Sequence, residues 1–252
     1  MADATATAAI GIICKTPRPG ASKTRLLPLL GPDGAAQLAG CFLRDIAAVI
    51  ESLPMAIGYR GYAVYAPEGS EETLRRYIPA AFGLVCRRDA TLGVVLSGAV
   101  EHLLAAGHDA VVLVNADSPT MPFELIRDAI SAVRAPGDRV VLGPATDGGY
   151  YLIALKTAHR HLFHDIAWST ASVLEQTLAR ASETGLAAHL LPPWYDVDDP
   201  ESLTALIDEV TLARPPPGLA DLPAGPAQST RALLAQHPGL RDSIAAASKD
   251  GP

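Results

Sequence analysis

A run of cations, hydroxyl residues and glycine follows the first apolar segment of the chain. A diphosphate or triphosphate must be met by several donors at once, and lysine, arginine and backbone N–H groups provide them. The run is neither a Walker A loop nor a dinucleotide fingerprint, because GxxxxGK[ST] and GxGxxG are both absent. We expect it to bind the phosphates of a nucleotide, and the alternative is an ordinary solvated basic loop. The residues given this role are Lys15, Pro17, Gly20, Ser22, Lys23, Thr24 and Arg25.

An aspartate follows the most apolar run of the sequence. Val111–Val114 lead through Asn115 to Asp117, which stands just before a Ser-Pro turn. A carboxylate and a phosphate can share one hard cation, usually Mg²⁺ or Mn²⁺, which needs few protein ligands when phosphates supply the rest. We therefore expect Asp117 to bind a divalent metal ion, and the alternative is that it only forms a local turn.

A second metal carboxylate has to come from elsewhere, and three acids precede Pro200. In an extended segment, alternation places Asp196 and Asp198 on one side of the chain. Asp199, directly before Pro200, is best explained as the cap of a helix. We prefer Asp198 as the second metal ligand, with Asp196 as the alternative.

A fourth segment, Asp147-Gly148-Gly149-Tyr150, combines a carboxylate with two glycines. Glycine lets the backbone approach a ligand closely or adopt a positive φ. We expect Asp147 to accept hydrogen bonds from sugar or acceptor hydroxyls while the Gly148 and Gly149 amides donate. The alternative is a purely structural hairpin, since Asp-Gly is a strong turn signal.

The elements that must position these residues alternate along the chain. Short β-branched runs predict strands, and the stretches between them have the apolar spacing of helices. Strands that are apolar on both faces and alternate with helices indicate an α/β fold with a mostly parallel sheet covered on two sides. The expected strands are 10–14, 62–65, 84–86, 110–114, 140–142 and 151–155, and the expected helices are 33–53, 71–77, 94–106, 122–133, 169–184 and 200–212.

Composition limits the remaining choices. A formal net charge of −7 and a pI near 5.4 argue against a nucleic-acid surface. No apolar run predicts a membrane span and the first residues do not resemble a signal peptide, so we expect a cytoplasmic protein. We expect a disordered lead-in over 1–9, one nucleotide-binding domain over 10–213, and a Pro-rich linker with a short helical tail over 214–252. A homodimer is left open.

Together these motifs resemble the DUF2064 group of bacterial nucleotide-diphospho-sugar transferase-like proteins, some of which carry the label of arsenosugar-biosynthesis glycosyltransferases. The resemblance runs from about Ile10 to Ile207 and rests on PRPGASKTRL, LGPDGAAQLAGCFLRDI, NADSPTMP, VVLGPATDGGYYLIAL, IAWSTASVLEQTL and DVDDPESL. It implies a GT-A-type fold with a three-layer α/β/α arrangement. The group is related to molybdopterin and phospholactate guanylyltransferases.

The resemblance also implies roles for particular positions. It makes Lys23 and Arg25 the phosphate grip, Asp117 and Asp198 the metal carboxylates, and 147–150 the acceptor side. Gly93 and Asn115 join the nucleotide site, and Trp168 joins the acceptor or sugar site. The sequence departs from the group in two places: Val94-Val95 replace a usual Glu-Arg pair, and Asn115 stands where glycine is common.

Three readings of the function follow. A glycosyltransferase would move a sugar from a nucleoside diphosphate sugar to a small acceptor, and we prefer this reading. A nucleotidyltransferase would join an NTP to a phosphorylated acceptor and release pyrophosphate. A non-catalytic nucleotide-binding protein on the same fold is the third, and the missing Glu-Arg pair is its support.

Overall fold

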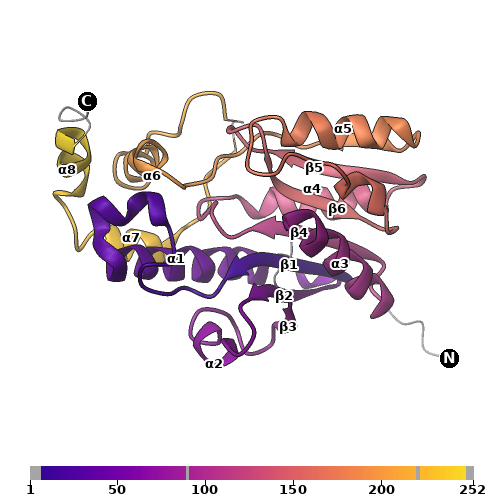
Figure 1. The fold of residues 1–252 in the computed structure, drawn as a ribbon, viewed down its shortest axis with the longest axis horizontal. Coiled ribbons are helices and arrows are strands. Elements are labelled where there is room, and N and C mark those ends of the chain that lie inside the picture. Colours follow the sequence, from indigo (N-terminus) through magenta and orange to yellow (C-terminus); the bar gives the residue numbers. More distant parts are fainter. Residues whose placement is uncertain (1–6, 89–90, 220–221, 248–252) are drawn as a thin grey trace.

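A seven-stranded sheet forms the centre of the computed structural model, which describes residues 7–88, 91–219 and 222–247 (Figure 1). The strand order is β3-β2-β1-β4-β6-β5-β7. β6 runs antiparallel to β4 and β5, and the other neighbouring pairs are parallel. The strands are β1 (Ala8–Lys15), β2 (Tyr59–Ala66), β3 (Gly83–Cys86), β4 (Ala110–Asn115), β5 (Arg139–Pro144), β6 (Tyr150–Leu155) and β7 (Ala187–Leu190).

Successive residues of the central strands are buried on opposite faces of the sheet. In β4, Val112 and Val114 belong to one apolar cluster, whereas Val111 and Leu113 belong to the other. The alternation follows from the two-residue period of a strand. It explains why a centrally placed strand must be apolar throughout, because both of its faces are covered.

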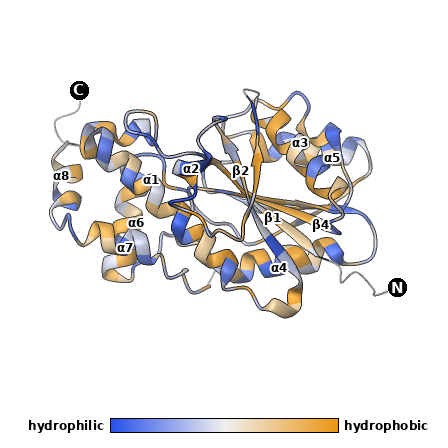
Figure 2. Cartoon of the chain, turned by 90° about the horizontal axis from the view of Figure 1, so that it is seen from below, coloured by the Kyte–Doolittle hydropathy of each residue, from blue (hydrophilic) through white to orange (hydrophobic). Residues whose placement is uncertain are grey.

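Helices cover both faces and produce three layers. The larger cluster includes residues of α1 (Leu27–Glu51), α4 (Phe123–Arg134) and α6 (Pro200–Leu212). The smaller cluster includes residues of α3 (Leu92–Ala105) and α5 (Val173–Glu183). Figure 2 shows α3 and α5 on one side of the sheet and α4 on the other. The predicted three-layer α/β/α fold with a mostly parallel sheet is therefore confirmed.

Helix α1 is long and largely apolar, with a kink near its start. The helix contains a non-helical Gly31 (φ 66°, ψ 173°) directly before Pro32. The helical stretch Thr24–Glu51, which includes α1, is long and apolar enough to cross a membrane by length and composition alone. Its residues Phe42, Ile46 and Ile50 are fully buried in the larger cluster. Packing against the sheet thus accounts for the apolar character of this helix.

Several elements differ from the sequence expectations, including α1, which begins at Leu27 rather than at residue 33, and α2, which ends at Leu74 rather than at residue 77. β1 begins at Ala8, inside the lead-in expected over 1–9, of which residues 1–6 lie outside the described part of the chain. α5 begins at Val173 rather than at residue 169. β7 was not predicted, since this edge strand is exposed at all four positions and has no apolar pattern to reveal it. The short elements are α2 (Glu71–Leu74) and the 3₁₀ helices η1 (Thr24–Leu26), η2 (Met55–Ile57) and η3 (Arg160–Phe163).

The C-terminal segment packs back onto the domain through α7 (Gln228–Leu234) and α8 (Leu240–Ala247). Asp45 of α1 is 3% exposed, and its two carboxylate oxygens accept the backbone N–H groups of Ser229 and Thr230, each at 2.8 Å. A buried carboxylate thereby satisfies the free donors at the start of α7. The tail is thus anchored to the first long helix of the domain, and Figure 1 shows α7 beside α1.

Candidate functional site

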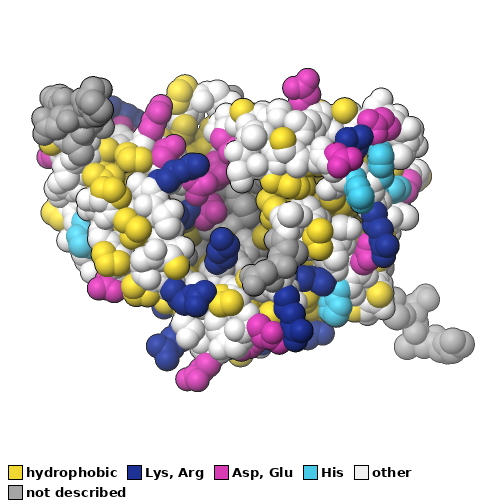
Figure 3. Space-filling model, viewed as in Figure 1, with side chains coloured by type: hydrophobic (Ala, Val, Ile, Leu, Met, Phe, Trp, Pro, Cys, Tyr) yellow, Lys and Arg dark blue, Asp and Glu magenta, His cyan; other side chains and the backbone are white. Residues whose placement is uncertain are grey.

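The basic loop and the segment that contains Asp117 leave the sheet at the same edge. β1 and β4 are parallel neighbours, with Ile13 paired to Asn115. Both therefore end at the carboxyl edge of the sheet, where α/β proteins commonly bind ligands. Figure 3 shows acidic and basic side chains gathered around a hollow on one face of the molecule.

Lys23 lies between the two aspartates that the sequence proposes as metal ligands. Its Nζ is 2.5 Å from Oδ1 of Asp117 and 2.9 Å from Oδ1 of Asp198. It also donates to the backbone carbonyl oxygen of Val197 at 2.6 Å. A single ammonium group thus joins the end of β4 to the segment that precedes α6.

Several contacts fix Lys23 in this position. Its backbone is left-handed (φ 47°, ψ 51°) just before η1, and its Nζ lies 5.1 Å from the centre of the Phe42 ring. Its side chain is only 5% exposed. Burial alone would lower the pKa of Lys23, but attraction to Asp117 and Asp198 outweighs it and raises that pKa. Lys23 is therefore charged and paired within the site.

The acid pair stays accessible on its outer side. The side chains of Asp117 and Asp198 are 38% and 47% exposed, although Lys23 beneath them is buried. Two hydrogen bonds fix the backbone of Asp117: its N–H donates to Oδ1 of Asn115 at 3.3 Å, and its carbonyl oxygen accepts the N–H of Val197 at 2.9 Å. A ligand arriving from solvent can reach the free carboxylate oxygens of both aspartates.

Asp196 adds a third carboxylate to this region. Burial raises the pKa of Asp196 to about 7, and the negative charges of Asp147, Asp198 and Asp117 contribute to this increase. Asp196 is therefore near enough to each of these three carboxylates to be repelled by it. Val197, which lies between Asp196 and Asp198 in the sequence, is fully buried. Its burial agrees with the expectation that Val197 and the two aspartates lie on opposite sides of this extended segment.

The donor set suits a hard divalent cation. Carboxylate oxygens are the preferred protein ligands of Mg²⁺ and Mn²⁺. One oxygen of Asp117 and one of Asp198 both contact Nζ of Lys23, so the two carboxylates are close enough to share a cation. Among the residues that the structure describes, no group of three or more His, Cys, Asp or Glu side chains is placed to hold a metal ion. A metal bound by this pair would need further ligands from phosphate or water, as Mg²⁺ commonly does.

Asp199 has the structural role expected from the sequence. Its Oδ1 accepts the backbone N–H of Ser202 at 2.9 Å, and a reciprocal bond from the N–H of Asp199 to Oγ of Ser202 completes a capping box at the start of α6. Bonds to Ser202, together with the positive charge of Arg25, outweigh burial and lower the pKa of Asp199. The cap fixes the direction of the chain directly after Asp198.

The glycine segment between β5 and β6 forms a tight, fixed turn. Oδ1 of Asp147 accepts the N–H of Gly149 at 2.8 Å. Gly148 has a φ of 91°, and a Cβ built there would lie 2.1 Å from the carbonyl oxygen of Ala171. The carbonyl of Gly148 accepts the N–H of Leu174 at 3.0 Å. Only glycine fits this close approach, which joins the turn to the start of α5.

Trp168, Tyr150 and Gly93 form a second group. The rings of Tyr150 and Trp168 meet edge to face with centroids 6.4 Å apart. A Cβ at Gly93 would lie 2.9 Å from Nε1 of Trp168 and 2.7 Å from the carbonyl oxygen of Phe163. Gly93 is therefore required for close packing of α3 against the indole. Val94 beside it is 61% exposed.

The remaining residues of the basic loop have diverse environments. Lys15 and Arg25 are exposed, whereas Pro17 is buried. Oγ of Ser22 accepts the N–H of Arg18 at 3.0 Å, and Gly20 has a φ of 72° that closes this turn. Thr24 begins η1 and is exposed. The exposed cations remain accessible to a ligand, unlike Lys23.

Sequence reasoning did not identify three features of the site. The carbonyl oxygen of Val197 and the ring of Phe42 both contact Lys23, and neither residue type signals such a role. The burial of Asp196 likewise depends on how this segment packs. The alternation of a strand predicts that Asp196 and Val197 point to opposite sides, but it does not predict how deeply Asp196 is buried.

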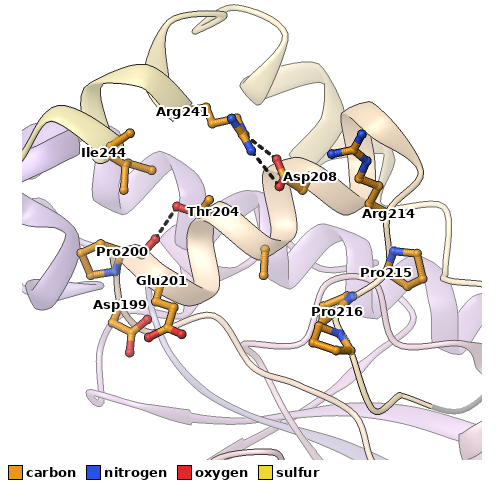
Figure 4. A pocket seen from close by; sticks show the side chains of 13 residues that line it. Asp199, Pro200, Glu201, Thr204, Asp208, Arg214, Pro215, Pro216, Arg241 and Ile244 are labelled. Atoms are coloured by element: carbon orange, nitrogen blue, oxygen red, sulfur yellow. Dashed lines mark hydrogen bonds and ion pairs between the residues drawn. The ribbon is translucent and has the colours of Figure 1, made fainter. Parts of the chain in front are cut away.

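A recess of about 840 Å³ lies between α6, the prolines at 215–217 and α8 (Figure 4). Arg241 binds Asp208 through Nε at 2.5 Å and Nη2 at 3.0 Å, and this pair lies on one wall. Asp199, the chain neighbour of Asp198, lines the same recess. The C-terminal tail thus forms part of the surface next to the candidate site.

Comparison with known proteins agrees with this fold. The family model described as "Uncharacterized protein conserved in bacteria (DUF2064)" matches residues 50–170. The resemblance noted in the sequence is confirmed over this range, which includes Asp117 and Trp168. Lys23 and Asp198 lie outside it. No curated protein matches the sequence.

The solved structures that are similar to the chain include two that match it over nearly its whole length. A proposed nucleotide-diphospho-sugar transferase from Desulfovibrio desulfuricans G20 is 27% identical, with a TM-score of 0.79 over 94% of this chain and 97% of that chain. A CMP:2-keto-3-deoxy-manno-octonic acid synthetase complexed with CTP is 15% identical, with a TM-score of 0.50 over 92% of this chain and 100% of that chain. At that identity the second similarity establishes the fold alone.

The fold is therefore that of the nucleotide-diphospho-sugar transferases, as the sequence predicts. The protein class that this similarity supports is a nucleotide-dependent transferase.

Proposed function

We propose that this protein is a metal-dependent glycosyltransferase that moves a sugar from a nucleoside diphosphate sugar to a small acceptor. The observation that carries the proposal is the cluster of Asp117, Asp198 and Lys23 at the carboxyl edge of β1 and β4. The similar protein from Desulfovibrio desulfuricans G20 supports the choice of donor. The pairing of phosphate-binding cations with metal-binding carboxylates is the arrangement that a diphosphate leaving group requires.

Each part of the site has a separate task in this proposal. Asp117 and Asp198 would hold Mg²⁺ or Mn²⁺, which when bound supplies positive charge to the leaving diphosphate. The exposed cations Lys15 and Arg25 would contact the phosphates from the loop after β1. Their effect on rate comes from fixed positive charge placed where negative charge accumulates.

The acceptor would be oriented by the turn between β5 and β6. One oxygen of Asp147 is already occupied by the N–H of Gly149, which leaves the other free to accept from a hydroxyl. In the reaction, the acceptor oxygen bonds to the anomeric carbon while the bond from that carbon to the diphosphate oxygen breaks. The bonding electrons leave with the diphosphate, and the acceptor proton passes to a carboxylate or to water. The rings of Tyr150 and Trp168 would pack against the sugar.

A nucleotidyltransferase is the second candidate, because the number of cations in the loop after β1 also suits a triphosphate. There the acceptor phosphate would attack the α-phosphorus of an NTP, and pyrophosphate would leave. A non-catalytic nucleotide-binding protein is the third candidate, and its support is the exposed Val94 where the resembled group has a charged residue.

Product analysis separates the three candidates. The purified protein would be incubated with Mn²⁺ and a panel of nucleoside diphosphate sugars or NTPs, with release of nucleoside diphosphate and of pyrophosphate measured separately. Sugar transfer predicts metal-dependent release of nucleoside diphosphate from a sugar donor. Release of pyrophosphate from an NTP would instead establish nucleotidyl transfer. Binding without turnover would favour the third candidate, and failure to bind any nucleotide would reject all three.

A further inference from the structure

The ammonium group of Lys23 has no hydrogen-bonding capacity left for a phosphate. A lysine ammonium carries three protons, and Nζ of Lys23 faces three oxygens, from Asp117, Val197 and Asp198. The side chain is also 5% exposed. In this arrangement Lys23 serves as an internal cation of the acid pair and cannot also bind a nucleotide.

The two carboxylate oxygens that hold Lys23 belong to the residues proposed to bind the metal. Oδ1 of Asp117 and Oδ1 of Asp198 both lie within 2.9 Å of the ammonium. A divalent ion placed between these oxygens would meet the positive charge of Lys23 at close range. The two cations therefore compete for the same carboxylates.

We propose that Lys23 is the resident counter-ion of Asp117 and Asp198, that a divalent metal ion binds this pair only as Lys23 moves away, and that the phosphates of a bound nucleotide receive the displaced ammonium. The inference rests on the metal assignment in the proposed function. Under this proposal, the metal ion and the nucleotide each increase the affinity of the protein for the other, because the phosphates give the displaced ammonium of Lys23 a new partner.

The environment of Lys23 supports such an exchange. A buried charge is stable only while it is paired, so a displaced Lys23 must move out to solvent or to another anion, and an anion beside the site makes the displacement easier. Its loop lies beside a solvent-accessible face, since Ala21, Thr24 and Arg25 are all exposed. The side chains of Asp117 and Asp198 are partly exposed as well. A metal–nucleotide complex arriving from solvent can thus meet the acids and offer phosphates to Lys23 together.

Binding of Mn²⁺ alone, followed by electron paramagnetic resonance, tests the competition without any substrate. Lys23→Met removes the internal cation and is expected to bind Mn²⁺ about tenfold more tightly than the unmodified protein. The double variant Lys23→Met/Asp117→Asn should lose that gain. Equal affinity of the single variant and the unmodified protein, with binding that still depends on Asp117, would overturn the competition while leaving the metal site intact. If replacing Asp117 does not change the Mn²⁺ affinity of any variant, both the metal assignment and this inference are wrong.

A measurement on the unmodified protein does not depend on whether Lys23→Met folds. Acetic anhydride labelling with mass spectrometry reports the reactivity of each lysine amine, and exposed Lys15 provides an internal reference. Lys23 should be protected in the metal-free protein and should become more reactive at saturating Mn²⁺, while Lys15 is unchanged. A Lys23 that stays equally protected at saturating Mn²⁺ would contradict its displacement.

Discussion

The Nζ of Lys23 and the Oδ1 of Asp117 are 2.5 Å apart, although Lys23 follows the first strand and Asp117 follows the fourth. The parallel pairing of β1 and β4 brings the two segments together, and Asp198 before α6 completes the contact at 2.9 Å. The pair therefore joins the basic loop to the acidic part of the site. Its geometry also indicates that binding a metal requires the site to rearrange.

The turn at Gly148 should tolerate no side chain. Gly148→Ala would place a Cβ 2.1 Å from the carbonyl oxygen of Ala171, at a φ of 91° that alanine disfavours. We expect a loss of about 2 kcal/mol or more in the free energy of unfolding. Urea denaturation followed by circular dichroism measures this change.

Gly149→Ala is the matched control for the turn. The nearest atom to a Cβ there is Oδ1 of Asp147 at 3.2 Å, and its φ is not in the left-handed region. A small loss of stability is expected, because the neighbouring carboxylate can adjust. Equal losses for the two variants would show that the close approach of Ala171 does not constrain this turn.

The fold was more accessible from the sequence than the site. The run from Val111 to Val114 is apolar throughout, and only a strand covered on both faces demands this, so β4 and its neighbours were predictable. The exposed β7 has no apolar pattern, and it forms because it pairs with β5 at the edge of the sheet. Propensity alone cannot anticipate such pairing.

The meeting of Asp117 and the basic loop at one edge of the sheet was predictable, but the contacts between their side chains were not. A strand followed by an aspartate places Asp117 at the sheet edge, and parallel topology places the basic loop beside it. Which cation approaches which acid depends on side-chain packing, including the ring of Phe42 beneath Lys23. The sequence therefore named Lys23 as a phosphate ligand and could not reveal its contacts with Asp117, Val197 and Asp198.

The anchoring of the C-terminal tail depends on Asp45. Asp45→Asn replaces one acceptor oxygen with an NH₂ group, so one of the N–H groups of Ser229 and Thr230 loses its partner. We expect a loss of about 1–3 kcal/mol in the free energy of unfolding, because Asp45 is buried and a buried donor without a partner is costly. Faster tryptic cleavage at Arg231 should accompany it.

Asp33→Asn is the control for this prediction, since Asp33 is an exposed aspartate on the same helix. It should leave both the stability and the cleavage rate unchanged. If Asp45→Asn behaves like this control, the tail is held by its apolar contacts rather than by the capped start of α7.

Glu209 should make stability depend on pH. Its side chain is 4% exposed, and Oε2 accepts the hydroxyl of Tyr195 at 2.7 Å. Burial raises the pKa of Glu209 despite this bond. The folded state therefore retains a proton that the unfolded state has released, so stability falls as pH rises from the unfolded pKa through the folded pKa.

Glu209→Gln removes this titration while keeping a polar group beside Tyr195. The variant should gain thermal stability relative to the unmodified protein as pH rises from acidic to neutral, and the two should be most alike at acidic pH, where Glu209 is protonated in both states. Melting temperatures measured across this pH range provide the comparison. A stability difference that is constant with pH would contradict the raised pKa of Glu209.

The central claim, that Asp117 holds the metal used for nucleotide binding, is tested most directly by thermal denaturation with nucleotide, in the presence and absence of Mn²⁺. The stabilisation that a nucleoside diphosphate sugar gives should increase with Mn²⁺ in the unmodified protein and in the Asp33→Asn control. Asp117→Asn should fold and lose the Mn²⁺-dependent increase. An Asp117→Asn protein that keeps the full Mn²⁺-dependent increase would contradict the account.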